Sequence, residues 1–229
     1  MNLLSYIGDF MFPRTCHVCG LGLSRSEKYV CTSCLSRLPR TNWHRLPDNG
    51  MEQRFLGLFP FRQASGHFFY SRDSDLSVLM HDLKYHGFRG LARYLGSVVA
   101  TELLTTGFLT GIDALVPVPM HFMKKARRGY NQTEEIAGGI SKITGIPVVN
   151  ALRAVRPHRT QTSMTLDERL ENTSGIFRLV DPEDIAGKEI LIVDDVCTTG
   201  ATLSAAASAV RKDSPSSVIS LLTRFLCLQ

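Results

Sequence analysis

The sequence predicts an α/β domain, with a mostly parallel sheet flanked by helices, that follows a small cysteine-rich module. Short runs rich in Val and Ile alternate with segments of helical periodicity, which is the pattern of parallel strands joined by helical crossovers. Four of the six cysteines lie between residues 16 and 34, and 229 residues leave room for one medium domain and an appendage. We therefore divide the chain into a cysteine module with its linker at 1–54 and an α/β domain at 55–229.

The composition is that of an ordinary folded protein. Hydrophobic residues make up 44% and charged residues 21%, which excludes a disordered or fibrous chain. No run approaches the ~20 apolar residues of a membrane-spanning helix, and residues 1–9 lack the basic start of a secretory signal. We expect a cytoplasmic protein without membrane insertion. The net charge of +5 permits an anionic partner without requiring one.

Apolar runs predict the strands, and the segments between them predict the helices. Strands are expected at 114–118, 146–149, 190–193 and 218–222. Helices are expected over 79–103, as a pair interrupted at Gly87 and Gly90, over 131–143 and 201–212, and as a short turn near 166–172. Residues 59–70 predict an antiparallel strand or hairpin at one edge of the sheet.

The cysteines of the module form two C-x2-C pairs, Cys16 with Cys19 and Cys31 with Cys34, separated by eleven residues. Each pair can direct two thiolates at one tetrahedral cation, and four thiolates leave no open position. This pattern predicts structural zinc in a ribbon-like module, rather than a redox pair or free thiols. Zinc binding supplies on the order of 10–16 kcal/mol in small zinc peptides, which a module poor in apolar residues needs.

The charge of the module leaves its partner open. Residues 1–54 carry seven Lys/Arg and four Asp/Glu, and four thiolates with one zinc ion reduce the net charge to roughly +1. Trp43, between Arg40 and Arg45, either stacks a nucleic-acid base or packs against its own domain. Contact with nucleic acid therefore stands beside docking to a protein and a purely structural role.

The strongest functional signal is the segment 190–203, in which a buried strand ends in Asp194 and Asp195. The turn at 198–202 then opens a helix with backbone amides and hydroxyls that suit a phosphate monoester, and Gly200 allows close approach. Carboxylates repel phosphate but accept strong hydrogen bonds from hydroxyls. A sugar phosphate with a vicinal diol satisfies both halves, at the carboxyl end of a strand where α/β sheets bind ligands.

Other interpretations of this region are weaker. Gly187-Lys188 is followed by Glu189 and lacks the earlier glycine of a Walker loop. Cys197 would open a phosphatase loop only if an arginine stood at position 203, where the chain has Leu203. We therefore take Cys197 as a small residue of the turn rather than a nucleophile, and an ordinary strand–turn–helix connection stays the alternative.

Two further segments are expected to face this turn. The first strand ends at Val116–Pro119 and leads into a basic loop whose Arg127 and Arg128 suit phosphate oxygens, with a solvated basic loop as the alternative. Asn131 is suited to cap the next helix. The long polar stretch at 152–177 predicts a lid that keeps water from a reactive sugar centre.

The segment 190–202 resembles the binding motif for 5-phosphoribosyl-1-pyrophosphate (PRPP) in type I phosphoribosyltransferases. The resemblance implies that Asp194 and Asp195 hold the ribose hydroxyls, that the turn at 198–202 cradles the 5′-phosphate, and that the loop after the first strand faces a magnesium-bound pyrophosphate. The full set of implied PRPP-binding residues is Asp194, Asp195, Val196, Cys197, Thr198, Thr199, Gly200, Ala201, Thr202, Arg127, Pro117 and Val118.

Taken together, the motifs along the whole chain resemble the ComF family of competence proteins. They are the four-cysteine module, Lys84-Tyr85-His86-Gly87, Arg128–Gln132, the lid residues Thr160, Gln161 and Arg169, and the turn after Asp194-Asp195. The resemblance implies a cytoplasmic bacterial protein that handles imported single-stranded DNA during natural transformation. No motif places a catalytic base, so Lys84 and Arg128 are the candidates for catalytic contacts, with a solvated helix-end lysine as the alternative for Lys84.

Two hypotheses of function follow. In the first, the chain is an enzyme that binds PRPP with Mg²⁺ and transfers the phosphoribosyl group to an unidentified acceptor. In the second, it is a non-catalytic adaptor whose pocket is a sensor or grips nucleic acid, and whose zinc module docks a DNA-translocation helicase or another competence protein. Deoxyribose lacks the 2′-hydroxyl, so an acid pair suited to a diol favours a ribose ligand.

Overall fold

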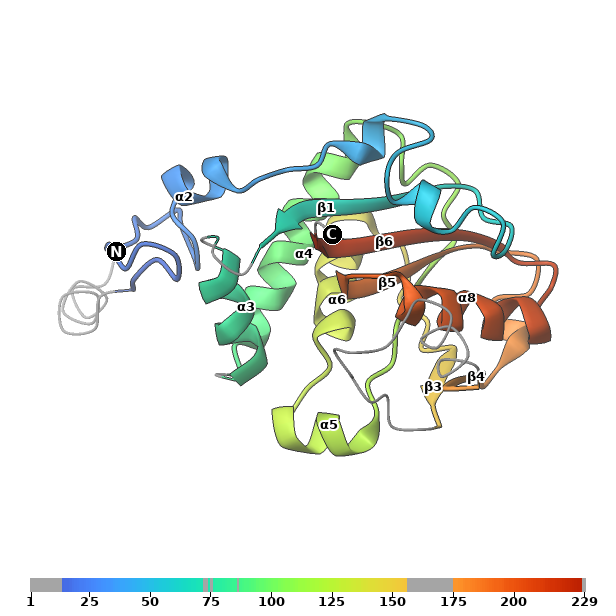
Figure 1. Cartoon of the computed structure of the whole chain (residues 1–229). Helices are drawn as coiled ribbons and strands as arrows, with labels where there is room; N and C mark the ends of the chain where they lie inside the picture. The colour runs from blue at the N-terminus through green and yellow to red at the C-terminus, as the bar shows by residue number, and fades with distance from the viewer. Residues whose placement is uncertain (1–13, 72–73, 75, 86, 156–174, 228–229) are drawn as a thin grey trace.

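The computed structural model describes residues 14–71, 74, 76–85, 87–155 and 175–227, apart from the side chains of Lys84 and Tyr85. Its centre is a parallel sheet in the order β1-β6-β5-β2 (Figure 1). The strands are β1 (Ala64–Tyr70), β2 (Ala114–Pro117), β5 (Glu189–Cys197) and β6 (Val218–Cys227). All three strand pairs run parallel, so the predicted parallel α/β sheet is confirmed.

The edge strand expected within 59–70 is present as β1, but its expected antiparallel direction is wrong. β1 pairs with β6 in parallel, with Ala64 opposite Leu221 and Tyr70 opposite Cys227. The chain leaves β1 through helices, so the partner strand comes from the far end of the sequence rather than from an adjacent hairpin. The outer side of β1 is also covered, because Arg40 forms an isolated antiparallel β-bridge with Phe68.

The predicted strand at 146–149 is reduced to a single parallel bridge between Leu115 and Val148. Leu115 donates its amide to the carbonyl of Pro147 and accepts from the amide of Val149, both at 2.9 Å. Pro147 has no amide hydrogen to extend the ladder. The segment therefore borders β2 without becoming a full strand.

The helical predictions are confirmed at most positions. The pair expected over 79–103 is α3 (Leu76–Tyr85) and α4 (Arg89–Leu104), and the other two expected helices are α6 (Gln132–Thr144) and α8 (Ala201–Asp213). The short helix expected near 166–172 lies outside the described residues. The basic segment expected as a loop instead contains α5 (Phe122–Arg128), which ends at Gly129 in the left-handed conformation.

Gly90 lies within α4 and does not interrupt the helix pair. A Cβ atom at Gly90 would come within 1.9 Å of the Tyr29 hydroxyl, so this glycine lets the cysteine module approach the helix closely. His17 and Asp82 make a second contact at 2.6 Å between Nδ1 and Oδ2. The module is therefore in contact with both α3 and α4.

The remaining elements are short. The module contains α2 (Thr32–Arg37), and the single-turn 3-10 helices are η1 (Trp43–Arg45), η2 (Glu52–Arg54) and η3 (Pro182–Asp184). β3 (Leu152–Ala154) and β4 (Phe177–Leu179) form a small antiparallel sheet at the two ends of the stretch 152–177 that is expected to be a polar lid. None of the helices among the described residues has the length and apolar composition needed to cross a bilayer.

Alternating residues of the central strands pack into two separate cores. On one face, Leu191 and Val193 contact the core that includes α4 and α6. On the other face, Ile190 and Ile192 pack in the core that includes α8. Each strand is apolar on both faces, as expected of parallel strands covered by helices. Figure 1 shows α4 and α6 on one side of the sheet and α8 on the other.

Residues 38–63, between α2 and β1 and from here on called the linker, pack along β1. The amide of Thr41 donates to the carbonyl of His67 at 3.0 Å, and the amide of Phe69 donates to that of Pro39 at 2.8 Å. Phe55 is completely buried in the core on the α8 side. The linker is thus in direct contact with the sheet, and the division of the chain at residue 54 stays a prediction.

Candidate functional site

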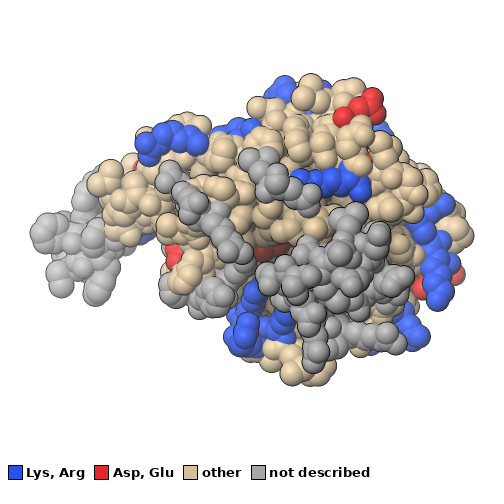
Figure 2. All heavy atoms as spheres, in the orientation of Figure 1, with Lys and Arg blue, Asp and Glu red and all other residues tan. Residues whose placement is uncertain are grey.

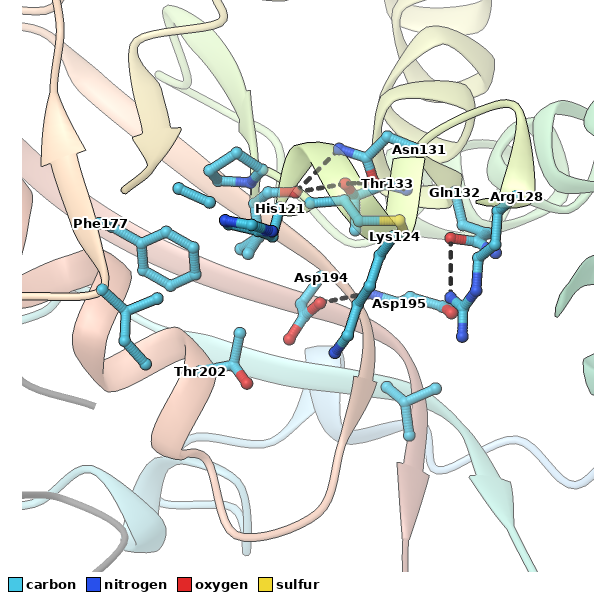
Figure 3. A pocket seen from close by; sticks show the side chains of 16 residues that line it. His121, Lys124, Arg128, Asn131, Gln132, Thr133, Phe177, Asp194, Asp195 and Thr202 are labelled. Atoms are coloured by element: carbon cyan, nitrogen blue, oxygen red, sulfur yellow. Dashed lines mark hydrogen bonds between the residues drawn. The ribbon is translucent and has the colours of Figure 1, made fainter. Parts of the chain in front are cut away.

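A cavity of about 220 Å³ opens at the carboxyl ends of β2 and β5 (Figure 3). Its walls come from the loop after β2, from α5, from the start of α6, from β3 and β4, and from the end of β5 with the start of α8. The lining residues are Val118, Pro119, Met120, His121, Lys124, Arg128, Asn131, Gln132, Thr133, Ala154, Ile176, Phe177, Asp194, Asp195, Val196 and Thr202.

The acid pair lies on the floor of this cavity. Asp194 is buried, and its Oδ1 accepts a hydrogen bond of 2.7 Å from the amide of Asp195. Asp195 accepts a hydrogen bond from Nη2 of Arg224, which lies on β6 with its side chain fully buried. The guanidinium also lies over the ring of Phe225, with 4.4 Å from Cζ to the ring centre. The positive charge of Arg224 therefore offsets the negative charge of one of the two adjacent carboxylates.

The protonation of Asp194 depends on its burial and on its neighbours. Burial raises the pKa of Asp194 to about 7, and the charge of Asp195 acts in the same direction. The hydrogen bond from the amide of Asp195 and the charge of Arg224 oppose this rise in the pKa. At neutral pH Asp194 therefore carries less than a full negative charge, which lowers the cost of placing it beside a second acid.

The turn that follows, residues 198–202, is here called the hydroxyl turn. Gly200 caps α8 with a φ of 87°, a conformation that favours glycine. A Cβ atom there would lie 2.8 Å from Cε1 of Phe55. Arg54 donates to the carbonyl oxygen of Thr198. The turn thus contacts the linker that precedes the sheet.

The loop after β2 is braced by the start of α6. The carbonyl of Val118 accepts hydrogen bonds from Nδ2 of Asn131 at 3.1 Å and from the hydroxyl of Thr133 at 2.6 Å. Asn131 also caps α6 by accepting from the amide of Thr133, so the predicted cap is confirmed. These contacts hold one wall of the cavity next to the acid pair, which lies on the neighbouring strand β5.

Cations border the opposite side of the cavity. Lys124 and Arg128 on α5 both line it, and Figure 3 shows the side chain of Lys124 extending towards the acids. Burial lowers the pKa of Lys124, and the positive charges of Arg128 and Arg127 lower it further. Figure 2 shows Lys and Arg atoms gathered where Figure 1 places α5, next to recessed acidic atoms. The site thus presents carboxylates on one side and ammonium and guanidinium groups on the other.

The structure brings together part of the site predicted from the sequence. Asp194, Asp195, Val196, Thr202, Val118 and Arg128 line the cavity. Cys197 is buried, which raises the pKa of its thiol to about 12, and Arg127 is exposed on α5. Five other predicted ligand residues do not line the cavity, although they are close in sequence to residues that do: Pro117, Thr198, Thr199, Gly200 and Ala201. The side chain of Lys84 and all of Thr160, Gln161 and Arg169 lie outside the described residues.

Other residues of the site lie in segments that the sequence predicts to face it, or were not predicted individually. His121 and Lys124 belong to the segment after the first strand that is expected to face the pyrophosphate, and both line the cavity. Phe177 reaches the cavity from β4, and Arg224 reaches Asp195 from β6. The signal for Arg224 was a single charge inside an apolar strand, because such a charge needs a buried partner.

The four cysteines form a second site. Their Sγ atoms all lie within 4.8 Å of one another, and the Sγ atoms of Cys19 and Cys31 are 3.8 Å apart. A tetrahedron with zinc–sulfur bonds of about 2.3 Å places its sulfurs roughly 3.8 Å apart. The amide of Cys31 donates to Sγ of Cys16 at 3.3 Å, which favours a thiolate. Donor set and spacing therefore fit one tetrahedral ion, and this is the one such cluster that the described residues contain.

Comparison with known proteins agrees with this architecture. Residues 90–223 match the family model described as the phosphoribosyl transferase domain, which covers β2, β5 and the cavity between them. The match begins within α4, so the cysteine module and the linker lie outside it.

Three relatives are similar to this chain, and two of them match it over most of its length. Competence protein F of Haemophilus influenzae is 32% identical over 60% of this chain, and the match spans only 62% of that protein. DNA utilization protein YhgH of Escherichia coli K12 is 29% identical over 89% of this chain and 86% of its own length. Competence protein ComFC of Bacillus subtilis is 22% identical over 97% of this chain and 94% of its own length. The chain therefore belongs to the phosphoribosyl transferase domain family, and these relatives group it with the ComF competence proteins, as its motifs predict.

Proposed function

We propose that this chain binds PRPP with Mg²⁺ as a phosphoribosyltransferase-like protein, and that it acts in the handling of imported single-stranded DNA during natural competence. The observation that carries the proposal is the acid pair at the end of β5, set beside the hydroxyl turn and opposite the cations of α5. A ligand with a diol, a monophosphate and a pyrophosphate matches these three features one for one.

The acid pair suits the ribose hydroxyls. Asp194 and Asp195 are adjacent acceptors, and Arg224 holds the orientation of one of them. A carboxylate that accepts from a hydroxyl forms a strong, charge-assisted hydrogen bond. Removing a proton or a water molecule from the buried Asp194 costs free energy. The two hydroxyls of a ribose diol can offset this cost. A deoxyribose supplies one hydroxyl fewer.

The phosphate groups are assigned to the two ends of the cavity. The hydroxyl turn begins α8, so its amides and the start of the helix favour a monophosphate. Lys124 and Arg128 suit the pyrophosphate, whose oxygens are also the hard donors that Mg²⁺ prefers. Mg²⁺ would offset the charge that builds up on the leaving pyrophosphate. The acceptor of the phosphoribosyl group is left unassigned, as is a catalytic base.

Isothermal titration calorimetry tests the ligand. The wild-type chain is expected to bind PRPP only when Mg²⁺ is present, and the double variant Asp194→Asn/Asp195→Asn to lose that binding. Asp113→Asn is the matched control, because the Asp113 carboxylate accepts from the amide of Glu189 at the opposite end of β5. Equal affinities of the wild type and the double variant would contradict the proposal.

We assign zinc to the cysteine site and a role in competence to the whole chain. Four thiolates at tetrahedral spacing support zinc, whose binding would stabilise a module with few buried apolar residues. The names of the relatives, two competence proteins and a DNA utilization protein, support the competence role. A cytoplasmic location and a helicase partner stay predictions.

A second candidate function is supported by the outer surface of α5. Phe122 is 72% and Met123 62% exposed, and the helix continues with Lys125 and Arg127, whereas its other two cations, Lys124 and Arg128, line the cavity. Lys125 pairs with Glu134 at 2.9 Å, but Arg127 is exposed. Cations next to an exposed aromatic ring fit single-stranded nucleic acid, which offers phosphates and stacking bases. The chain would then be an adaptor that contacts DNA through this helix.

Fluorescence anisotropy with a labelled single-stranded oligonucleotide, measured over a range of salt concentrations, separates the two functions. If α5 contacts DNA, Arg127→Gln should weaken binding and reduce the slope of log affinity against log salt by about 1. Phe122→Ala should weaken binding without changing that slope. Lys142→Gln, an exposed charge near the end of α6, is the control. Pyrophosphate release from PRPP without DNA affinity would favour the enzyme instead.

A further inference from the structure

The hydroxyl turn is held by a side chain from far upstream in the sequence. Arg54, the last residue of η2, donates through Nη1 to the carbonyl oxygen of Thr198. Through Nη2 it donates to the carbonyl oxygen of Cys227, the last residue of β6, at 3.1 Å. One guanidinium therefore ties the start of the turn to the neighbouring strand.

The next residue, Phe55, shapes the same turn by packing. Its side chain is fully buried, and its ring occupies the space that a side chain at Gly200 would need. A Cβ atom at Gly200 would lie 2.8 Å from Cε1 and 3.1 Å from Cζ of Phe55. The close approach of the turn backbone and its positive φ are thus both matched to this ring.

The linker is fixed to the sheet just before these two residues. Nδ2 of Asn49 donates to the carbonyl of Ala64 at 2.9 Å, and its Oδ1 accepts from the amide of Met51 at the same distance. Oε1 of Glu52 accepts from the amide of Ala64 at 3.1 Å. The linker is therefore anchored to the first residue of β1, which gives Arg54 and Phe55 a fixed position.

The contact with Thr198 has a consequence for the next amide. In a planar trans peptide the carbonyl and the following N–H point in opposite directions. Arg54 holds the carbonyl of Thr198 towards itself, so the amide of Thr199 points away from Arg54. The direction of an amide at the start of a helix decides whether an anion can accept from it.

We propose that Arg54 and Phe55 are positioning residues for the 5′-phosphate, an inference that rests on the PRPP function proposed above. The phosphate subsite is then built from two distant parts of the chain. The hydroxyl turn supplies the donors, and the linker that follows the cysteine module fixes their direction. The linker lies outside residues 90–223, the part that matches the family model, so the domain alone would bind the phosphate poorly.

The test uses the full zinc-loaded chain and PRPP with Mg²⁺. Arg54→Gln should lower PRPP affinity about 10- to 100-fold, because it removes charge-assisted hydrogen bonds to the two carbonyls. Arg54→Lys keeps one charged donor, so its PRPP affinity should lie between those of the wild type and Arg54→Gln. Arg62→Gln is the matched control: Arg62 also belongs to the linker, but it binds Glu189 and the carbonyl of Thr110 at the other end of β5.

A second readout separates positioning from general destabilisation. In ³¹P NMR at saturating PRPP, Arg54→Gln should shift the resonance of the 5′-phosphate and leave both pyrophosphate resonances in place. Unchanged affinity in Arg54→Gln, or equal shifts of all three resonances, would overturn the inference while leaving PRPP binding intact. If the wild type fails to bind PRPP at all, the proposed function fails and this inference fails with it.

Discussion

The cysteine module and the cavity of the sheet domain hold their functional groups in different ways. The four cysteines come from one stretch of nineteen residues, 16–34, in which only Cys16, Val30 and Cys34 are buried. The cavity instead draws on four separate stretches of the chain, 118–133, 154, 176–177 and 194–202, which meet at the carboxyl ends of β2 and β5. We infer that a bound ion maintains the first site, whereas the second is maintained by the fold.

Metal removal is the change expected to have the largest effect, and it should act on one region alone. Loss of zinc would remove on the order of 10–16 kcal/mol of binding free energy from the module. The sheet keeps its core, so its amides should stay protected. Hydrogen exchange with and without a zinc chelator measures both regions at once. Unchanged protection of the module, or loss of protection in β5 and β6, would contradict this division.

The buried pair on the sheet is expected to rank second. Arg224→Met would leave Asp195 without its buried partner, at a cost of about 3–5 kcal/mol in the free energy of unfolding. The double variant Arg224→Met/Asp195→Leu removes both charges and should recover most of this loss. Urea denaturation measures the three proteins. A double variant no more stable than the single one would show that the side chain of Arg224 matters mainly for packing.

The buried Asp194 is expected to lower the free energy of unfolding at neutral pH and above, where its carboxylate is proposed to bind the ribose. Burial gives Asp194 a pKa of about 7, above its ordinary value of 3.8, so the folded chain binds the extra proton between these values. Stability therefore falls as the pH rises from about 4 through 7. Asp194→Asn should raise the free energy of unfolding at pH 8 by a few kcal/mol at most, and by less at pH 4. Denaturation at both pH values is the measurement, and an asparagine variant less stable at pH 8 would contradict it.

The smallest change in stability is expected where Arg40, which follows the cysteine module, contacts the sheet domain. Glu102 on α4 accepts from Arg40 at 2.8 Å and from His67 at 3.0 Å. Burial alone would raise its pKa, but hydrogen bonds from His67 and Arg40, together with their charges, hold it at about 2. This contribution is complete above about pH 4.5 and is lost as the pH falls towards 2. Glu102→Gln should cost about 1–2 kcal/mol at pH 7 and flatten that acid-side slope. An equally steep slope in the variant would exclude Glu102 as its source.

The same contrast explains what could be predicted from the sequence. The cysteine pairs, the acid pair and the hydroxyl turn are each continuous in sequence, so their spacing alone indicated their chemistry. The parallel sheet was also predictable, because strands apolar on both faces alternate with helical periods. These features depend on neighbours along the chain.

The contacts that the sequence could not predict join residues that are far apart along the chain. Arg54 meets Thr198 across 144 positions, and Arg224 meets Asp195 from the neighbouring strand. The direction of β1 was missed for the same reason, because its partner β6 is the last strand of the chain. Strand register and crossover path decide such pairs, and neither can be read from local spacing.

Whether PRPP binds at the carboxyl ends of β2 and β5 can be seen in a crystal structure of the full chain with PRPP and Mg²⁺. We predict density with both ribose hydroxyls within hydrogen-bonding distance of Asp194 and Asp195, the 5′-phosphate on the amides of residues 198–202, and the pyrophosphate towards Lys124 and Arg128. PRPP bound elsewhere, or bound here with its hydroxyls turned away from both acids, would contradict the account.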